Sequence, residues 1–191
     1  MNNTKLGLLA LTMLAVAGCG KEAATPPKHP WASFKAGSYA KIRMTSAMNV
    51  AGKPINTTVE IKQTLVELKA TSAVVEIETT VMGKTSTTRK DFPLSAASPL
   101  TGAPGDGVMP AGVPAADSGK VLNKGTETIT IAGKPVSCKW TESAVAQGAN
   151  SGTVKIYMSE QIPGGIAKMI TKISGNVNTE STLEVIEFLA K

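Results

Sequence analysis

The residues of this chain that could do covalent or acid–base chemistry are few: two cysteines, Cys19 and Cys138, and a single histidine, His29. Cys19 follows a short basic head (residues 1–5), an apolar run (residues 6–17) and a small residue. A basic head, a short apolar run and small residues before a cleavage point are the parts of an export signal. The run is too short to cross a bilayer, which takes ~20 apolar residues. The pattern therefore predicts export, with a thiol placed at the cleavage point.

The segment Val16-Ala17-Gly18-Cys19 resembles the lipobox of bacterial lipoproteins. In that family the thiol at the position of Cys19 is joined to a diacylglyceryl group, the chain is cut before it, and the new amine is acylated. The resemblance implies a signal peptide over residues 1–18 and a membrane anchor on Cys19. An ordinary signal peptide followed by a chance cysteine is the alternative. Enterobacterial lipoproteins with Asp at the next position stay in the inner membrane, so Gly20 implies the outer membrane, with the domain facing the periplasm or the exterior.

The composition of the chain predicts its domain boundaries and limits the classes of binding partner. Residues 19–30 are polar and proline-rich, which predicts an extended tether, and residues 31–191 are enough for one domain with a substantial core. The formal net charge is +6, but the basic residues occur singly along the chain rather than in a patch. We therefore expect no nucleic acid as a partner. The charge is ascribed to solubility or to attraction by anionic lipid headgroups and other envelope polyanions.

The rest of the sequence predicts a ladder of strands. Ala40, Ile42 and Met44 alternate with polar residues, and the other segments are likewise rich in β-branched residues. Short turns that contain Gly separate the segments, because Gly supplies the positive φ that tight turns require. We expect a mostly β domain, an antiparallel meander of about eight or nine strands curved into a half-barrel or open barrel, since a flat sheet leaves edges that invite aggregation. The predicted strands lie near residues 38–50, 55–69, 73–82, 85–92, 125–132, 135–146, 152–160, 166–175 and 177–189.

Three segments leave alternatives open. Residues 166–173 and 181–190 could also form helices, and in the second of them Leu183, Ile186 and Leu189 would share one helical face. Strand is the favoured prediction for both segments. Residues 94–119 are dominated by Gly, Pro and Ala without periodicity, which predicts a long loop, either a cover over one face of the sheet or a connector.

The sequence offers no catalytic constellation. His29 falls in the predicted tether, where nothing would fix its imidazole, so hydrolase chemistry of the Ser-His-Asp or Cys-His kind lacks a base. We therefore expect no enzyme activity and no cofactor. Two pairs of carboxylates lie along predicted strands, Glu60 with Glu67 and Glu76 with Glu78. We interpret them as part of the solvated face of these strands rather than as an acid–base pair.

Cys138 is interpreted as a structural residue. With Cys19 lipidated it has no disulfide partner, and it alternates with Val136 and Trp140 along one face of a predicted strand. A small buried hydrophobe is the prediction for such a thiol. A metal site built on His and Cys is likewise not expected, because Cys138 is the only free thiol.

Two segments are more distinctive: residues 29–39, with the pattern Pro-Trp-x-x-Phe-x-x-Gly-Ser, and residues 157–168, with an aromatic-x-Ser-x-x-x-Pro-Gly-Gly-x-x-Lys turn. They resemble segments of uncharacterised exported β-rich bacterial proteins. The predicted ladder is also similar in architecture to lipoprotein carriers and receptors of the LolA/LolB kind. In those proteins a curved antiparallel sheet surrounds acyl chains and helices plug it. This chain shows no such helices, unless residues 94–119 or the C-terminus replace them.

These features favour a non-catalytic envelope lipoprotein whose curved sheet binds a lipid or another apolar ligand. Aromatic residues make up only 4% of the chain, so aliphatic and Met side chains, which adapt to acyl chains, must build the apolar face. The alternative is a structural or protein-interaction module of the envelope with a packed core. These two hypotheses make different predictions for one set of residues, which lines a cavity if the protein binds a ligand and packs to native density if it is an interaction module. The set consists of the predicted ligand-binding residues Ile42, Met44, Val75, Ile77, Ile129, Trp140, Ile156 and Met158, together with Cys138.

Overall fold

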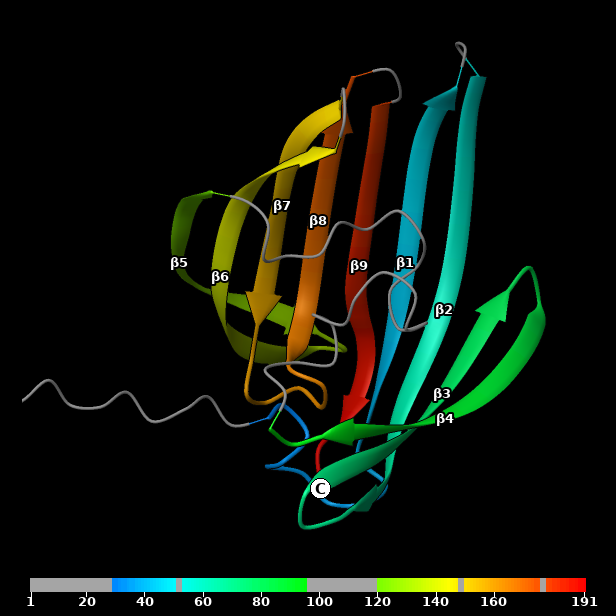
Figure 1. Ribbon diagram of the computed structural model, residues 1–191, viewed down its shortest axis with the longest axis vertical. Coiled ribbons are helices and arrows are strands. Elements are labelled where there is room, and N and C mark those ends of the chain that lie inside the picture. Colours follow the sequence, from blue (N-terminus) through cyan, green and yellow to red (C-terminus); the bar gives the residue numbers. More distant parts are fainter. Residues whose placement is uncertain (1–28, 51–52, 96–119, 148–149, 176–177) are drawn as a thin grey trace, which may run out of the picture.

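Nine antiparallel strands in a single sheet make up the fold (Figure 1). The computed structural model describes residues 29–50, 53–95, 120–147, 150–175 and 178–191, and no helix occurs among them. Within these ranges no helix is long and apolar enough to cross a membrane. The strands are β1 Tyr39–Val50, β2 Lys53–Leu68, β3 Ser72–Val81, β4 Lys84–Pro93, β5 Val121–Ile131, β6 Lys134–Gln147, β7 Asn150–Met158, β8 Ile166–Ser174 and β9 Asn178–Leu189.

The sheet joins two meanders. Its strand order is β4-β3-β2-β1-β9-β8-β7-β6-β5, so the pairing of β1 with β9 connects the first meander to the second. β4 and β5 form the two edges and do not pair with each other, and Figure 1 shows the sheet curved but open. The predicted fold class, a mostly β antiparallel meander in an open half-barrel, is confirmed.

The predicted strands agree closely with the observed ones. The two segments that could also have formed helices are strands β8 and β9. In β9 the buried residues are Leu183 and Val185, two positions apart, which is the period of a strand and not of a helix. The largest difference is the start of β5 at Val121, where the register shifts between Val121 and Asn123 and breaks the alternation on which the prediction depended.

One face of the sheet carries charged residues in ion pairs. Glu60 Oε2 lies 2.9 Å from Lys41 Nζ, and Glu60 Oε1 lies 3.0 Å from Arg43 Nη2. Hydrogen bonds from Lys41 and Arg43 lower the pKa of Glu60. Cross-strand pairs continue along this face at Arg89–Glu76, Lys62–Glu78 and Lys172–Glu180, with N···O distances of 2.8, 3.6 and 3.3 Å. Exposed pairs of this kind stabilise a fold little. We call the side on which these pairs lie the charged face. Lys53, Lys84 and Lys90 lie on the opposite side, because they pair with Val50, Val81 and Val75.

The lower end of the sheet in Figure 1, which we call the base, is covered by residues 29–38 and 159–165. Gly37 N donates a hydrogen bond of 2.7 Å to Leu65 O, and Leu65 N donates one of 2.9 Å to Ser38 O. The C-terminal residue joins this network, because Lys191 N donates to Ser38 Oγ at 3.0 Å. Trp31 is fully buried here.

The two distinctive sequence segments meet at the base. Gly164 has a φ of +86°, and a Cβ at this position would lie 3.3 Å from both Trp31 Cζ2 and Gln63 Oε1. Gly165 has a φ of +82°, and its Cβ would lie 3.0 Å from Pro30 Cβ. Glycine adopts this left-handed backbone without steric cost and leaves room for the neighbouring rings. The Pro-Gly-Gly turn and the Pro-Trp segment therefore form one packed unit.

The buried side of β6 changes along the strand. Ser143 and Val145 are buried near its end, whereas Val136 and Cys138, of the opposite parity, are buried near its start. The pairing of β6 with β7 continues from Lys139 to Gln147 without a register shift, so a bulge in this pairing does not cause the change. The first residues of β6 extend beyond β7 and pair only with β5, and a two-stranded ribbon twists more strongly than a wide sheet.

We expect Gly152→Ala to destabilise the sheet by about 1–3 kcal/mol, the usual cost of overpacking. A Cβ at Gly152 would lie 1.9 Å from the backbone oxygen of Lys172 on the paired strand β8, so the two strands would have to separate. Urea unfolding measures the loss. Gly83→Asn is the control, because Gly83 faces open space at a φ of +77°, which Asn tolerates. Equal stability of Gly152→Ala and the parent would contradict the strand spacing described here.

Candidate functional site

The face opposite the charged one carries no charged side chain on β1, β3, β7, β8 and β9 where the structure describes them, and we call it the uncharged face. Its lysines lie at its margins: Lys53 at the start of β2, Lys84 and Lys90 on the edge strand β4, and Lys124 and Lys139 on β5 and β6. Its members follow from the alternation of residues within each strand and from the register between strands. They are Ala40, Ile42, Met44, Ser46 and Met48 on β1; Ile55, Thr57, Val59, Ile61, Gln63 and Leu65 on β2; Ala73, Val75, Ile77, Thr79 and Val81 on β3; Gly152, Val154, Ile156 and Met158 on β7; Met169, Thr171 and Ile173 on β8; and Thr179, Ser181, Leu183, Val185 and Phe188 on β9.

Aliphatic and Met side chains form a continuous row across five strands of this face. Met44 on β1 pairs with Val59 on one side and with Leu183 on the other. The row continues through Met169 and Ile156, which are paired to it in register. Leucine and methionine side chains at its centre are buried, while the two end residues are half-buried. This row is the apolar part of the candidate site.

A row of hydroxyl groups lies next to the apolar row. On each strand it is two residues away, after the apolar residue on β1 and β8 and before it on β2 and β9. Ser46 pairs with Thr57 on β2 and with Ser181 on β9, and Ser181 pairs with Thr171 on β8. Ser46 Oγ and Ser181 Oγ are 3.0 Å apart, within hydrogen-bond distance. Beyond Val154 on β7, the same row reaches Ser143 on β6. We call Ser46, Thr57, Ser143, Thr171 and Ser181 the hydroxyl row. None of these side chains carries a charge.

The structure places most of the predicted ligand-binding residues on the uncharged face. Ile42, Met44, Val75 and Ile77 are buried there, Ile156 is half-buried, and Met158 is 36% exposed at the end of β7. The other two predicted residues lie on β5 and β6. Trp140 pairs with Tyr157 on the charged face, whereas Ile129 pairs with Val136, which is 1% exposed in the twisted start of the β5–β6 ribbon. Ile129, Trp140 and Ile156 nevertheless pack against the same buried cluster, which contains Cys138 together with Ile42, Met44, Val75 and Ile77.

Trp140 belongs to a small aromatic cluster on the charged face. Lys155 Nζ lies 3.9 Å from the centre of the Trp140 ring and 5.0 Å from that of Tyr157. A hydrogen bond with Tyr157 raises the pKa of Lys155. The Trp140 ring covers Gly125, where a Cβ would lie 2.8 Å from a ring carbon. This packing of an aromatic ring over a strand glycine compensates for the missing side chain.

Comparisons with known proteins assign no family to this geometry. No family model matches the chain, and no curated protein is similar to it in sequence. The solved structure of a DUF1329 family protein from Desulfovibrio piger ATCC 29098 aligns over 78% of this chain and 86% of its own, with 9% sequence identity and a TM-score of 0.23. A likeness this distant supports no conclusion about function.

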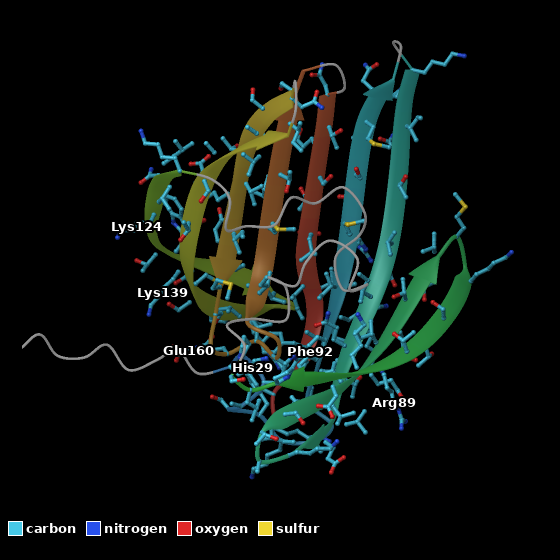
Figure 2. All side chains as sticks on the ribbon, viewed as in Figure 1. His29, Arg89, Phe92, Lys124, Lys139 and Glu160 are labelled. Carbon is cyan, nitrogen blue, oxygen red and sulfur yellow. The ribbon has the colours of Figure 1, made fainter. Side chains whose placement is uncertain are left out.

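His29 corrects an expectation from the sequence. It was predicted to lie in the tether, yet it is 3% exposed and forms the start of the base (Figure 2). Trp31 N donates a hydrogen bond of 3.3 Å to His29 Nδ1, so the proton of the neutral ring sits on Nε2. Neither His29 Nε2 nor Trp31 Nε1 has a hydrogen-bond partner among the described residues. Burial lowers the pKa of His29, which keeps the imidazole neutral at pH 7.

We expect the free energy of unfolding to fall as the pH falls below about 6.5, the pKa of histidine in an unfolded chain. Because the native pKa is lower, the unfolded state binds a proton that the native state excludes over this interval. The contribution is fully present above about pH 6.5 and is lost as the pH approaches the native pKa. Urea unfolding at about pH 7.5 and 5.5 measures it. His29→Gln should remove most of the difference; an unchanged difference would show that another group causes it.

The remaining reactive groups are structural where the structure describes them. Cys138 is 1% exposed and burial raises its pKa, which confirms the predicted buried thiol. Glu76 and Glu78 pair with cations on the charged face, as their spacing predicts for a solvated strand face. No group of three or more metal-ligating side chains occurs in the described ranges. The predicted signal peptide, Cys19 and nearly all of the loop 94–119 lie outside the described residues.

Proposed function

We propose that this protein is a lipid-anchored protein of the bacterial envelope whose uncharged face binds an acyl chain. The observation that carries the proposal is that one face of the central strands β1, β9, β8 and β7 carries no charged side chain, whereas the opposite face of the sheet carries ion pairs. A sheet face that is solvated in the ordinary way carries charged side chains, as the charged face does here. On the uncharged face, Ile55 is 46% exposed, and Met48 and Ile173 are half-buried. Apolar surface that water still reaches is suited to an apolar ligand.

The composition of the face supports a flexible ligand. Met44 and Met169 lie at the centre of the apolar row, and Met48 lies two residues beyond Ser46. Methionine side chains are unbranched and polarizable, so they adapt to an irregular or mobile partner. Acyl chains are such partners, whereas a rigid aromatic ligand is better served by aromatic walls.

The anchor is the second part of the proposal. The lipobox resemblance supports cleavage before Cys19 and acylation there, and more than one acyl chain holds a protein firmly on a membrane. We expect the mature protein to begin at lipidated Cys19 and to fractionate with membranes, the outer one in particular. Cys19→Ala should leave the chain uncleaved or release it into the soluble fraction. An unchanged N-terminal mass together with unchanged membrane fractionation would contradict the anchor and leave the ligand untested by this variant.

The ligand is tested by lipid analysis of the purified full chain. The chain is produced in bacteria, isolated from the envelope in a mild detergent, and examined by native mass spectrometry before and after organic extraction. We expect a non-covalent acyl lipid in addition to the mass of the anchor. A chain that retains no lipid, and takes none up from vesicles that contain phospholipid and fatty acid, would contradict the proposal.

A second candidate is a protein-interaction module, and the edge strand β5 supports it. Val121 and Leu122 are 54% and 51% exposed at the start of this unpaired edge. Exposed strand edges with apolar residues are sites at which another chain can pair. A partner that co-purifies with the parent and is lost from Leu122→Lys, with no lipid bound to either protein, would favour this candidate over the first.

A further inference from the structure

Thr171, at the centre of the hydroxyl row, has a polar atom without a partner. Its side chain is only 3% exposed, and its Oγ1 makes no hydrogen bond within the described part of the chain. Burying a hydroxyl group without a partner costs about 1–3 kcal/mol. The neighbouring hydroxyl groups are different, because Ser46 Oγ and Ser181 Oγ bond to each other at 3.0 Å. Thr171 therefore has a buried hydroxyl group on the uncharged face whose hydrogen-bonding capacity no described residue satisfies.

The surroundings of this hydroxyl group define the chemistry that it could bind. On one side lies the apolar row of Met44, Leu183 and Met169, and on the other lie Met48 and Ile173. No charged side chain occurs beside it on this face of β1, β7, β8 or β9. A carboxylate or phosphate at this depth would find no cation on this face of these four strands, and burying an unpaired charge is costly. A neutral acceptor between apolar segments avoids that cost.

We infer that the hydroxyl row is a subsite for the ester carbonyl of an acyl lipid, with the Thr171 hydroxyl as its hydrogen-bond donor. The inference rests on the proposed function and names its ligand class: an acyl ester, not a free fatty acid. The acyl chain lies along the apolar row, and any charged headgroup of the lipid stays off the uncharged face. Thr171 binds the ester carbonyl directly, and Ser46 and Ser181 complete a neutral polar band beside it.

The test compares two photoreactive lipids that differ only at the carbonyl group. The full chain is reconstituted into phosphatidylcholine vesicles that contain a diazirine-labelled diacylglycerol, an ester, or the matching dialkylglycerol, an ether. We expect the parent to crosslink the ester about 2- to 10-fold more than the ether, the range that one net hydrogen bond gives. The crosslinked peptides should come from β1, β8 and β9.

Variants separate the subsite from general lipid binding. Thr171→Val should abolish the preference for the ester and leave crosslinking of the ether unchanged, and Thr171→Ser should retain the preference. Thr182→Val, on the charged face of β9, is the control and should behave like the parent. Without probe, Thr171→Val should melt no lower than the parent, because the methyl group replaces a hydroxyl that has no described partner.

The outcomes distinguish the two proposals. Equal crosslinking of ester and ether by the parent overturns the subsite but not acyl binding. A preference that survives in Thr171→Val, or that disappears equally in Thr182→Val, also overturns the subsite, since another group would then read the carbonyl. If neither lipid crosslinks to the uncharged face, the proposed function itself fails.

Discussion

Trp31→Ala is expected to lower the free energy of unfolding by about 3–5 kcal/mol, the usual cost of truncating a fully buried aromatic residue. Trp31 is 0% exposed, and its ring packs over Gly164 in the Pro-Gly-Gly turn. Removing the ring would leave a cavity where the N-terminal segment meets the β7–β8 loop. Urea unfolding measures the change, and thermal unfolding should show a fall in Tm of about 6–20 °C for a domain of this size.

Trp140→Ala is the matched control for that substitution. Trp140 is half-buried on the charged face, where Lys155 and Gly125 are its neighbours. Its truncation removes a surface contact and a cation–π interaction, which together should cost less than the loss of Trp31. If Trp140→Ala were the more damaging change, the base would not be the main packed unit of this fold.

Ser46→Lys is expected to reduce acyl-chain binding at least about ten-fold, a change that corresponds to ~1.4 kcal/mol. Ser46 lies in the hydroxyl row beside Met44 and Met48, so a lysine there places a charge on the uncharged face. An ammonium group cannot be buried under an acyl chain without a large desolvation cost. The lipid that co-purifies with the full chain is the measurement.

Thr45→Lys is the control for this second prediction. Thr45 is the preceding residue of β1, it is exposed, and it lies on the charged face. A lysine there should leave both stability and lipid content near those of the parent. Loss of lipid from both variants would mean that the effect comes from the strand and not from the face, and retention by both would place the ligand elsewhere.

Periodicity predicts the strands of this protein but not how they combine. Alternation from Ala40 to Met48, whose even residues are buried up to Met44 and half-buried beyond it, correctly indicated a half-buried strand. Alternation says which residues of one strand share a face, whereas the register decides which faces of different strands join. For that reason alternation alone could not show that the pairing of Trp140 with Tyr157 places its ring on the charged face, although Trp140 still packs against the cluster that contains Ile42. The pairing of β1 with β9, which joins the two meanders, has no local signal at all.

The base contains a second feature that could not be predicted from the sequence, the burial of His29. His29 follows a polar, proline-rich stretch, and its side chain type gives no sign of burial. It is buried in a turn in which Ala32 N donates to His29 O and Trp31 N donates to His29 Nδ1. The distinctive segments with Pro30-Trp31 and Pro163-Gly164-Gly165 could have indicated the packed unit at the base, because the two segments pack against each other. The hydroxyl row, by contrast, comes from single Ser and Thr residues on separate strands and appears only once the register is known.

We expect a ligand to cover the uncharged face of the sheet, and the accessibility of cysteines placed on the two faces measures this directly. Ser181→Cys places a thiol on the uncharged face, and Thr182→Cys places one on the charged face of the same strand. The native Cys138 is 1% exposed and burial raises its pKa, so it should react slowly. Alkylation rates of the full chain are compared before and after lipid extraction. We expect extraction to speed labelling of Ser181→Cys and to leave Thr182→Cys unchanged. Equal rates for Ser181→Cys before and after extraction would contradict a ligand on the uncharged face.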